Sequence, residues 1–469
     1  MGKIKSTVLM MMTLLLVFSS VFSYGGNVEA SFDASVDTAL LVDAETGKIL
    51  YQSNIDQPLP PASMTKMMSE YLILEAVNNG EISWEQEVPI SDYNAQLSHD
   101  RSLSNVPLRQ DETYTVKELY ETVAIYSANA ATMALAELIA GSEGNFVKKM
   151  NEKGKELGLG ETLREAGEEF GMDNLEEIAN ADEGDFQFVN STGLPNRLLE
   201  GNHPEGTNGD EDNYMSARAT GTLAFHLIND FPEVLDTASI SEKKFKEGSE
   251  DEINMQNWNW MIPGTMYGDL DFEAMDGLKT GFTNAAGYTF TGTGEQNGQR
   301  FVSVVMKADS EPHRFEETQR LMEYGFNQFS EVELFPEGMT IEDNETFPVT
   351  KGKEDEVSIS TEEAVSMLVL NGEEEGYGYE VAWDESLFDD KGKLIAPVEE
   401  GQVVGTMTVI SEDGNSTYLQ DDGSDQSQIN IVTDQAVEKA GWFTLMFRSI
   451  GSFFASVWTS VADTVSGWF

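Results

Sequence analysis

Strand patterns stand at both ends of the N-terminal two-thirds of this chain, and helical patterns fill the stretch between them. The segment 38–51 contains two apolar runs joined by Glu-Thr-Gly-Lys, which predicts a β-hairpin. Alternating residues in 279–290 and 300–307 flank the turn dipeptide Asn297-Gly298, which predicts adjacent antiparallel strands. A helical pattern over about 314–326 follows them. The order predicts an α+β fold in which helices flank an antiparallel sheet.

Changes in composition divide the rest of the chain. Residues 1–30 combine two lysines, an apolar stretch and a small-residue end, which predicts a cleaved export signal rather than a retained anchor. A first domain is expected over 31–330. Short alternating runs punctuated by Gly and acidic turns over 331–432 predict a second, smaller β-rich domain. The Gly-, Glu- and Asn-rich stretch 154–215 lacks regular periodicity and is interpreted as surface insertions.

The C-terminal segment 435–469 is rich in aromatic and aliphatic residues spaced mostly by three and four. This spacing predicts an amphipathic helix. Arg448 and Asp463 disfavour a spanning segment, so the helix is expected to lie in the surface of a membrane. The alternative is a helix packed on its own domain. With the export signal, this places the protein at the outer, wall-facing side of the cytoplasmic membrane.

The charge of the chain limits its partners. Its 469 residues include 83 acidic and 28 basic side chains, a formal net charge of −55, which argues against nucleic acid. So acidic a surface suits concentrated salt and predicts a halophilic source. The absence of cysteine excludes disulfides, lipid attachment through cysteine and thiolate catalysis. Four histidines lack the spacing of a metal site, so no metal or other cofactor is expected.

Ser63-Met-Thr-Lys66 is the first motif that could carry chemistry. It follows Pro60-Pro61 at the start of a helical pattern, so Ser63 and Lys66 are expected on one face of a helix. Serine needs an adjacent base, and a lysine qualifies when burial and a second cation, here Lys279, lower its pKa. The spacing alone is not specific, because Ser241-Glu-Lys-Lys244 shares it.

Two further motifs lie far along the chain. Ser127-Ala-Asn129 interrupts a helical stretch, where the hydroxyl could relay a proton and the amide could bind a peptide group; a polar helix junction is the alternative. Lys279-Thr280-Gly281 begins an alternating strand, which would place the Lys and Thr side chains on opposite faces. The glycine would let a substrate backbone lie close. An ordinary polar strand start is the alternative.

Taken together and in this order, the motifs match the pattern of β-lactamases and penicillin-binding proteins. With their contexts, Pro60 to Met68 and Asp276 to Thr283, the chain over about 35–469 resembles the D-alanyl-D-alanine carboxypeptidases among the low-molecular-mass penicillin-binding proteins. The resemblance implies an antiparallel sheet flanked by helices, a β-rich domain and a C-terminal amphipathic anchor. It also implies a stem peptide ending in D-Ala-D-Ala as substrate and β-lactams as inhibitors.

The resemblance also assigns roles to residues. Ser63 would be acylated, Lys66 would accept its proton, and Ser127 would pass a proton to the departing D-alanine. The expected substrate-binding residues are Asn129, Lys279, Thr280, Gly281, Phe282 and Arg314. Backbone N–H groups of Ser63 and Phe282 would form the oxyanion hole. For Arg314 an ordinary surface arginine is the alternative.

Two other functions share part of this pattern. A serine β-lactamase uses the same pair with a glutamate-positioned water, which Glu176-x-x-x-Asn180 could supply, but β-lactamases lack a second domain and a membrane tail. A penicillin-sensing receptor or wall-binding protein without turnover would need spanning helices and a cytoplasmic module, which the sequence does not indicate.

Overall fold

The structure is a computed structural model that describes residues 32–342, 344–411, 417–420 and 428–446. The described residues from Val36 onward form one compact unit. The predicted export signal, 1–30, lies outside the described residues, as does the tail beyond residue 446. In the described part, no helix combines the length and the apolar character that crossing a membrane requires.

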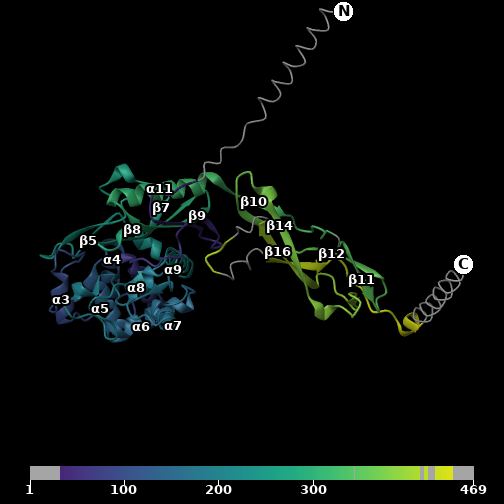
Figure 1. The fold of residues 1–469 in the computed structure, drawn as a ribbon, viewed down its shortest axis with the longest axis horizontal. Coiled ribbons are helices and arrows are strands. Elements are labelled where there is room, and N and C mark those ends of the chain that lie inside the picture. Colours follow the sequence, from purple (N-terminus) through teal and green to yellow (C-terminus); the bar gives the residue numbers. More distant parts are fainter. Residues whose placement is uncertain (1–31, 343, 412–416, 421–427, 447–469) are drawn as a thin grey trace, which may run out of the picture. The chain divides into compact units, whose positions relative to one another are not determined.

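A five-stranded antiparallel sheet in the order β2-β1-β9-β8-β7 organises the first domain (Figure 1). Its strands are β1 (Thr38–Asp43), β2 (Ile49–Ser53), β7 (Met275–Thr283), β8 (Gly287–Gln296) and β9 (Gln299–Ala308). The two predicted hairpins are therefore neighbours in space, because β1 pairs with both β2 and β9. The stretch 279–290 spans parts of two strands, β7 and β8, and not one as the alternation suggested, because Asn284 to Ala286 form a turn.

Helices cover both faces of this sheet. A Cβ built on Gly221 of helix α9 (Ala217–Asp230) would lie 2.5 Å from Leu40, and one on Gly325 of helix α11 (Glu311–Gln328) would lie 2.9 Å from Leu41. Because Leu40 and Leu41 are successive in β1, they point to opposite faces, so α9 and α11 lie on opposite sides. Every residue of β1 is buried, which explains its apolar run.

The helical middle predicted between the hairpins is present. Its nine helices among the described residues are α2 (Lys66–Asn78), α3 (Asp92–Ser98), α4 (Val116–Tyr126), α5 (Asn129–Ala140), α6 (Glu143–Glu156), α7 (Leu163–Phe170), α8 (Leu175–Asn180), α9 (Ala217–Asp230) and α10 (Val234–Ala238). A further helix, α11 (Glu311–Gln328), follows the last strand of the sheet. Two small pairs accompany them, β3 (Phe186–Gln187) with β4 (Tyr214–Met215), and β5 (Glu242–Phe245) with β6 (Ile253–Gln256). The short 3-10 turns here are η1 (Ala62–Thr65), η2 (Asn196–Leu199) and η3 (Gly268–Leu270).

The interpretation of 154–215 as surface insertions was wrong. The segment contains α7, α8, β3 and β4, and it closes its own small core, made of Leu163, Ala166, Leu175, Ile178, Ala179, Val189 and Tyr214. The two short helices contribute only two and three apolar residues to this core, and the surrounding acidic and Gly residues hide such short stripes from a periodicity search. Its residues 190–194 form a buried turn, which reaches the site described below.

The predicted β-rich second domain is also present. Six strands form a sheet in the order β14-β16-β17-β12-β11-β15, and β10 pairs with β13. The bounds are β10 (Phe329–Phe335), β11 (Thr346–Thr350), β12 (Glu356–Thr361), β13 (Val365–Leu370), β14 (Tyr377–Trp383), β15 (Leu394–Ile395), β16 (Val403–Ser411) and β17 (Gln428–Thr433), with 3-10 turns η4 (Glu374–Gly376) and η5 (Glu385–Leu387). Val357, Ile359, Val404, Met407 and Ile431 centre its core.

The predicted amphipathic helix does not begin at residue 435. Val437 is fully buried in the β-rich core and pairs with Val398, and Lys439 pairs with Gly352. Helical geometry begins at Trp442, where Trp442 and Phe443 are 68% and 67% exposed. Any anchor therefore starts after residue 441.

Candidate active site

Ser63 lies in η1, the turn that precedes α2, as the Pro60-Pro61 context predicted. It is half-buried, while every other residue from Pro61 to Glu70 is buried. Ala62 has a φ of 49°, a left-handed conformation that turns the chain just before the serine. The backbone thus presents one hydroxyl to a cavity and buries the residues around it.

Lys66 begins α2 and is fully buried. Its Nζ lies 3.1 Å from Ser63 Oγ, 2.8 Å from Asn129 Oδ1 and 2.7 Å from the Thr192 carbonyl oxygen. The last two atoms accept hydrogen bonds and cannot donate them. A neutral amine has two N–H groups and one lone pair, so these two acceptors would leave the lone pair directed at the Ser63 hydroxyl.

The electrostatics favour that neutral form. Burial lowers the pKa of Lys66 well below its usual value of 10.5, the nearby charge of Lys279 lowers it further, and Glu70 opposes both. Burial likewise lowers the pKa of Lys279 to about 8, with a smaller contribution from Arg314. The expected second cation is therefore in place beside Lys66.

Glu70 is a member of this cluster that the sequence analysis missed. It follows Lys66 by one helical turn and is 3% exposed. Burial raises the pKa of its carboxyl to about 7, against the opposing charges of Lys279 and Lys66. The sequence could have indicated it, because a residue four positions after Lys66 lies on the same face of the helix.

Replacing Glu70 is expected to shift the pH dependence of acylation. The carboxylate raises the pKa of Lys66, so Glu70→Gln should lower that pKa, and the rising limb of the acylation rate should move to lower pH. Rates of labelled-penicillin acylation across pH measure the shift. Glu75→Gln is the matched control, because Glu75 lies on the same helix and pairs with Lys153 Nζ at 2.8 Å. A limb that stays in place or moves upward in Glu70→Gln contradicts the expectation.

Ser127-Ala-Asn129 is the break between α4 and α5. Ser127 ends α4 with a φ of 61°, and its Oγ accepts a hydrogen bond from Lys279 Nζ at 2.9 Å. Asn129 uses both ends of its amide within the protein: Oδ1 accepts from Lys66, and Nδ2 donates to the Ser104 carbonyl at 2.9 Å. The motif is thus a helix junction, and its side chains join those of Lys66 and Lys279.

Lys279-Thr280-Gly281 lies in β7, the edge strand of the sheet. Packing gives the glycine a further reason that the sequence did not indicate. A Cβ on Gly281 would lie 2.4 Å from Thr289 Oγ1 and 2.5 Å from the Pro61 carbonyl oxygen, so a side chain here would collide with protein atoms. The glycine lets the strand pack against the turn that carries Ser63.

Arg314 is not an ordinary surface arginine. It lies in α11 and is 2% exposed. Its Nη1 donates to the Gly281 carbonyl at 3.0 Å, and its Nη2 pairs with Glu311 Oε1 at 3.1 Å. Burial lowers the pKa of its guanidinium to about 10. The Nε atom is buried and has no hydrogen-bond partner in the structure.

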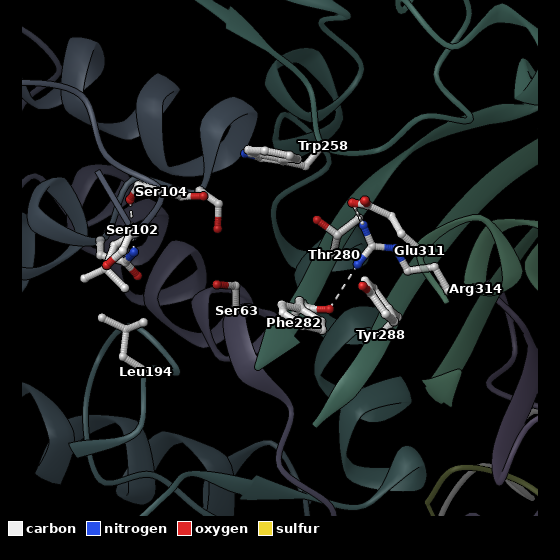
Figure 2. Close-up of a pocket in the computed structure, with 14 residues that line it drawn as sticks. Ser63, Ser102, Ser104, Leu194, Trp258, Thr280, Phe282, Tyr288, Glu311 and Arg314 are labelled. Carbon is white, nitrogen blue, oxygen red and sulfur yellow. Dashed lines mark hydrogen bonds and ion pairs between the residues drawn. The ribbon is translucent and has the colours of Figure 1, made fainter. Parts of the chain in front are cut away.

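Most of these residues line one cavity of about 320 Å³ (Figure 2), whereas Lys66, Glu70 and Lys279 are buried outside its lining. In the figure Ser63 lies between Ser102, Ser104 and Leu194 on one side and Thr280, Phe282 and Arg314 on the other, with Trp258 above. The lining residues are Ser63, Ser102, Leu103, Ser104, Ser127, Asn129, Leu194, Trp258, Thr280, Gly281, Phe282, Tyr288, Glu311 and Arg314. Trp258, Leu103 and Leu194 carry no motif, so the sequence analysis did not find them. The Phe282 side chain is 51% exposed and stacks on Tyr288.

Residues with a superficially similar pattern lie elsewhere. Lys244 belongs to β5 and pairs with Glu252, outside the cavity lining. Glu176, the glutamate that a β-lactamase would require, is exposed on α8 and lines a different cavity with Asp210 and Glu211. Within the described ranges, no group of three or more His, Asp or Glu residues could hold a metal ion.

A buried lysine bonded to a half-exposed serine, beside the edge strand of an antiparallel sheet, indicates the active-serine enzymes that use lysine as base. A family model described as D-alanyl-D-alanine carboxypeptidase matches residues 26–310, and a second, described as penicillin-binding protein 5, C-terminal domain, matches residues 329–439. The first match covers more than half of the chain. The protein belongs to the D-alanyl-D-alanine carboxypeptidase family of low-molecular-mass penicillin-binding proteins.

Relatives extend the likeness over most of the chain. D-alanyl-D-alanine carboxypeptidase DacF of Bacillus subtilis (strain 168) is 28% identical over 452 residues, 96% of this chain and 98% of that protein. The structure of a peptidoglycan synthesis regulatory factor (PBP3) from Streptococcus pneumoniae is 32% identical, with a TM-score of 0.63 over 86% of this chain and 100% of that one. Penicillin-binding protein 5 from Haemophilus influenzae is 25% identical, with a TM-score of 0.62 over 87% and 99%. The protein is a serine-type carboxypeptidase.

Proposed function

We propose that the protein removes the terminal D-alanine from peptidoglycan stem peptides ending in D-Ala-D-Ala, through an acyl-enzyme on Ser63. The observation that carries this proposal is the contact between Lys66 Nζ and the Oγ of Ser63 at 3.1 Å, since Ser63 lines the cavity. A buried lysine with a lowered pKa is a base that can activate a serine near neutral pH.

In the acylation step, Lys66 takes the proton of Ser63 while Oγ attacks the carbonyl carbon of the penultimate D-alanine. Backbone N–H groups of Ser63 and Phe282 are proposed to hold the oxyanion that forms. The C–N bond then breaks, and Ser127 passes a proton originating from Ser63 to the departing amine. The 2.9 Å contact from Lys279 to Ser127 Oγ supports this role, because a cation makes the hydroxyl a better proton donor. Water then hydrolyses the ester, releasing the shortened peptide and free Ser63.

The substrate carboxylate is proposed to bind at the opposite wall of the cavity. Thr280 and Arg314 lie together there (Figure 2). Lys279 precedes Thr280 in β7, and its Nζ donates to Ser127 Oγ at 2.9 Å. A guanidinium held by Glu311 and the Gly281 carbonyl is oriented before the substrate arrives. Asn129 would bind the peptide group through the remaining N–H of its amide, and Gly281 would shape the strand edge.

One experiment tests this function. The protein is incubated with a pentapeptide ending in D-Ala-D-Ala and, separately, with labelled penicillin. Release of D-alanine together with a long-lived penicilloyl adduct is expected. Rapid penicillin turnover without D-alanine release would identify a β-lactamase, and a stable adduct without D-alanine release would identify a sensor; either result overturns the proposal.

We further propose that residues 1–30 direct export, that 31–330 and 331–432 are the two domains, and that the tail holds the protein peripherally on the outer face of the cytoplasmic membrane. A variant ending at Gly441 keeps the buried Val437 and should retain its fold. It should leave the membrane fraction, because exposed Trp442, Phe443 and all following aromatics are removed. Partitioning between membrane and soluble fractions measures this, and unchanged partitioning rejects the anchor.

The acidic composition supports a halophilic source as a separate proposal. Mutual repulsion within a chain of net charge −55 is screened by salt. Thermal unfolding at low and high ionic strength tests the idea, which fails if the protein is equally stable in both.

A further inference from the structure

The Thr192 carbonyl, one of the two pure acceptors around Lys66, belongs to the 190–194 turn. This turn packs directly against the active-site backbone. Gly193 has a φ of 82°, and a Cβ there would lie 1.8 Å from the Ala62 carbonyl oxygen. The position of the turn therefore decides where the Thr192 acceptor lies relative to Lys66 and Ser63.

Internal hydrogen bonds give the turn its shape. Asn190 Oδ1 accepts from the backbone N–H groups of Thr192 and Gly193 at 3.0 and 2.8 Å, and Asn190 Nδ2 donates to the Leu194 carbonyl at 2.6 Å. All of these bonds lie within residues 190–194, so they do not attach the turn to the surrounding helices.

Glu143, at the start of α6, supplies one such attachment. Its Oε1 accepts from the Ser191 backbone N–H at 3.0 Å and from Ser191 Oγ at 2.6 Å. On the other side of the same residue, Ser69 Oγ of α2 donates to the Ser191 carbonyl at 2.6 Å. Ser191 is thus held from α6 and from α2, one residue before the carbonyl that contacts Lys66.

The buried carboxyl group of Glu143 has no positive charge facing it among the described residues. Glu143 is 9% exposed, and the titratable groups that face it are the Glu137 carboxyl on α5 and the Tyr93 hydroxyl on α3, neither of which is positive. Burial raises its pKa to about 7. A buried acid without a cation costs stability, so its two hydrogen bonds to one residue are the compensating contacts in the structure.

We propose that Glu143 is a positioning residue for the base: it fixes Ser191, so that the Thr192 carbonyl directs the lone pair of Lys66 at Ser63. The inference rests on the proposed role of Lys66. It assigns a task in the reaction to an acid that belongs to none of the three motifs.

The test compares acylation rates and turnover in folded variants. Glu143→Ala should lower kcat and the penicillin acylation rate by about 10- to 100-fold, as a small misplacement of a reacting group does, with KM nearly unchanged. Glu143→Gln keeps an oxygen acceptor for both bonds and should restore the rate to near wild type. Ser191→Ala loses one of the two bonds and should fall between them.

A matched control and a double variant separate positioning from general stability. Glu137→Ala removes a half-buried carboxyl bonded to Asn94 Nδ2 at 3.0 Å, and should lower the melting temperature without changing kcat. In a Lys66→Ala background, Glu143→Ala should cost nothing further, because its effect passes through Lys66.

Specific outcomes overturn the inference. The first is a folded Glu143→Ala variant with kcat within twofold of wild type, and the second is a Glu143→Gln variant as slow as Glu143→Ala. The third is that Glu143→Ala lowers the acylation rate by the same factor in the wild-type and the Lys66→Ala backgrounds. If Glu143→Ala does not fold, unchanged kcat in Ser191→Ala overturns it. A wild-type protein that releases no D-alanine would instead refute the proposed function.

Discussion

Ser63→Ala is expected to form no penicilloyl adduct and to lose D-alanine release by roughly 10⁶-fold, the loss seen when an active-site nucleophile is removed. The chemistry proposed for this site begins at Ser63 Oγ, which alone would carry the acyl group. The side chain is half-buried, so the melting temperature should change little. Labelled-penicillin binding and D-alanine release measure the two losses.

The decoy serine provides the control. Ser241 stands three residues before a lysine, as Ser63 does, but it precedes strand β5 and lies outside the cavity lining. Ser241→Ala should keep full activity. A penicilloyl adduct that persists in Ser63→Ala, or disappears in Ser241→Ala, would show that the acylated serine has been assigned to the wrong position.

Lys66→Ala is expected to slow acylation by about 10²- to 10⁴-fold, the usual contribution of a general base. The variant leaves Asn129 Oδ1 and the Thr192 carbonyl without their lysine donor, which costs about 1–3 kcal/mol for each buried group left unsatisfied. It also removes a fully buried polar amine together with its desolvation cost, which offsets part of that loss. The protein should therefore remain folded, as a melting curve can check.

A second substitution separates the base from a simple positive charge. Arginine keeps its proton at all working pH values, so Lys66→Arg should be about as slow as Lys66→Ala. If Lys66→Arg acylates at the wild-type rate, Lys66 acts as a cation and not as a base. Lys244→Ala, in the exposed decoy, is the matched control and should acylate normally.

The sequence was informative where local pattern and chemistry coincide. Prolines mark the turn before Ser63, an apolar run marks β1, alternation marks parts of β7, β8 and β9, and a polar break marks the α4–α5 junction. These features depend on neighbouring residues, so periodicity and turn residues detect them. The order of the three motifs then indicated the family, as the comparisons confirmed.

The remainder of the site depends on contacts between residues far apart in sequence. Glu143 and Ser191 are 48 residues apart, and Lys66 and Thr192 are 126 apart. No local pattern encodes a backbone carbonyl as a ligand of lysine. The acidic composition around 190–194 moreover suggested a surface loop, although Asn190, Ser191 and Thr192 are completely buried. Gly281 is a second example, because the backbone that it packs against belongs to Pro61, which is far away in the sequence.

The contact between Gly193 and Ala62 has a consequence for how this enzyme could diversify. Backbone atoms meet there without an intervening side chain, so main-chain packing itself helps to set the position of the nucleophile relative to the turn that faces its base. Substitutions at Trp258 or Leu103, which line the cavity outside that turn, could therefore alter which peptides fit without disturbing this contact. In this fold, substrate preference can therefore change during evolution while the catalytic geometry stays the same.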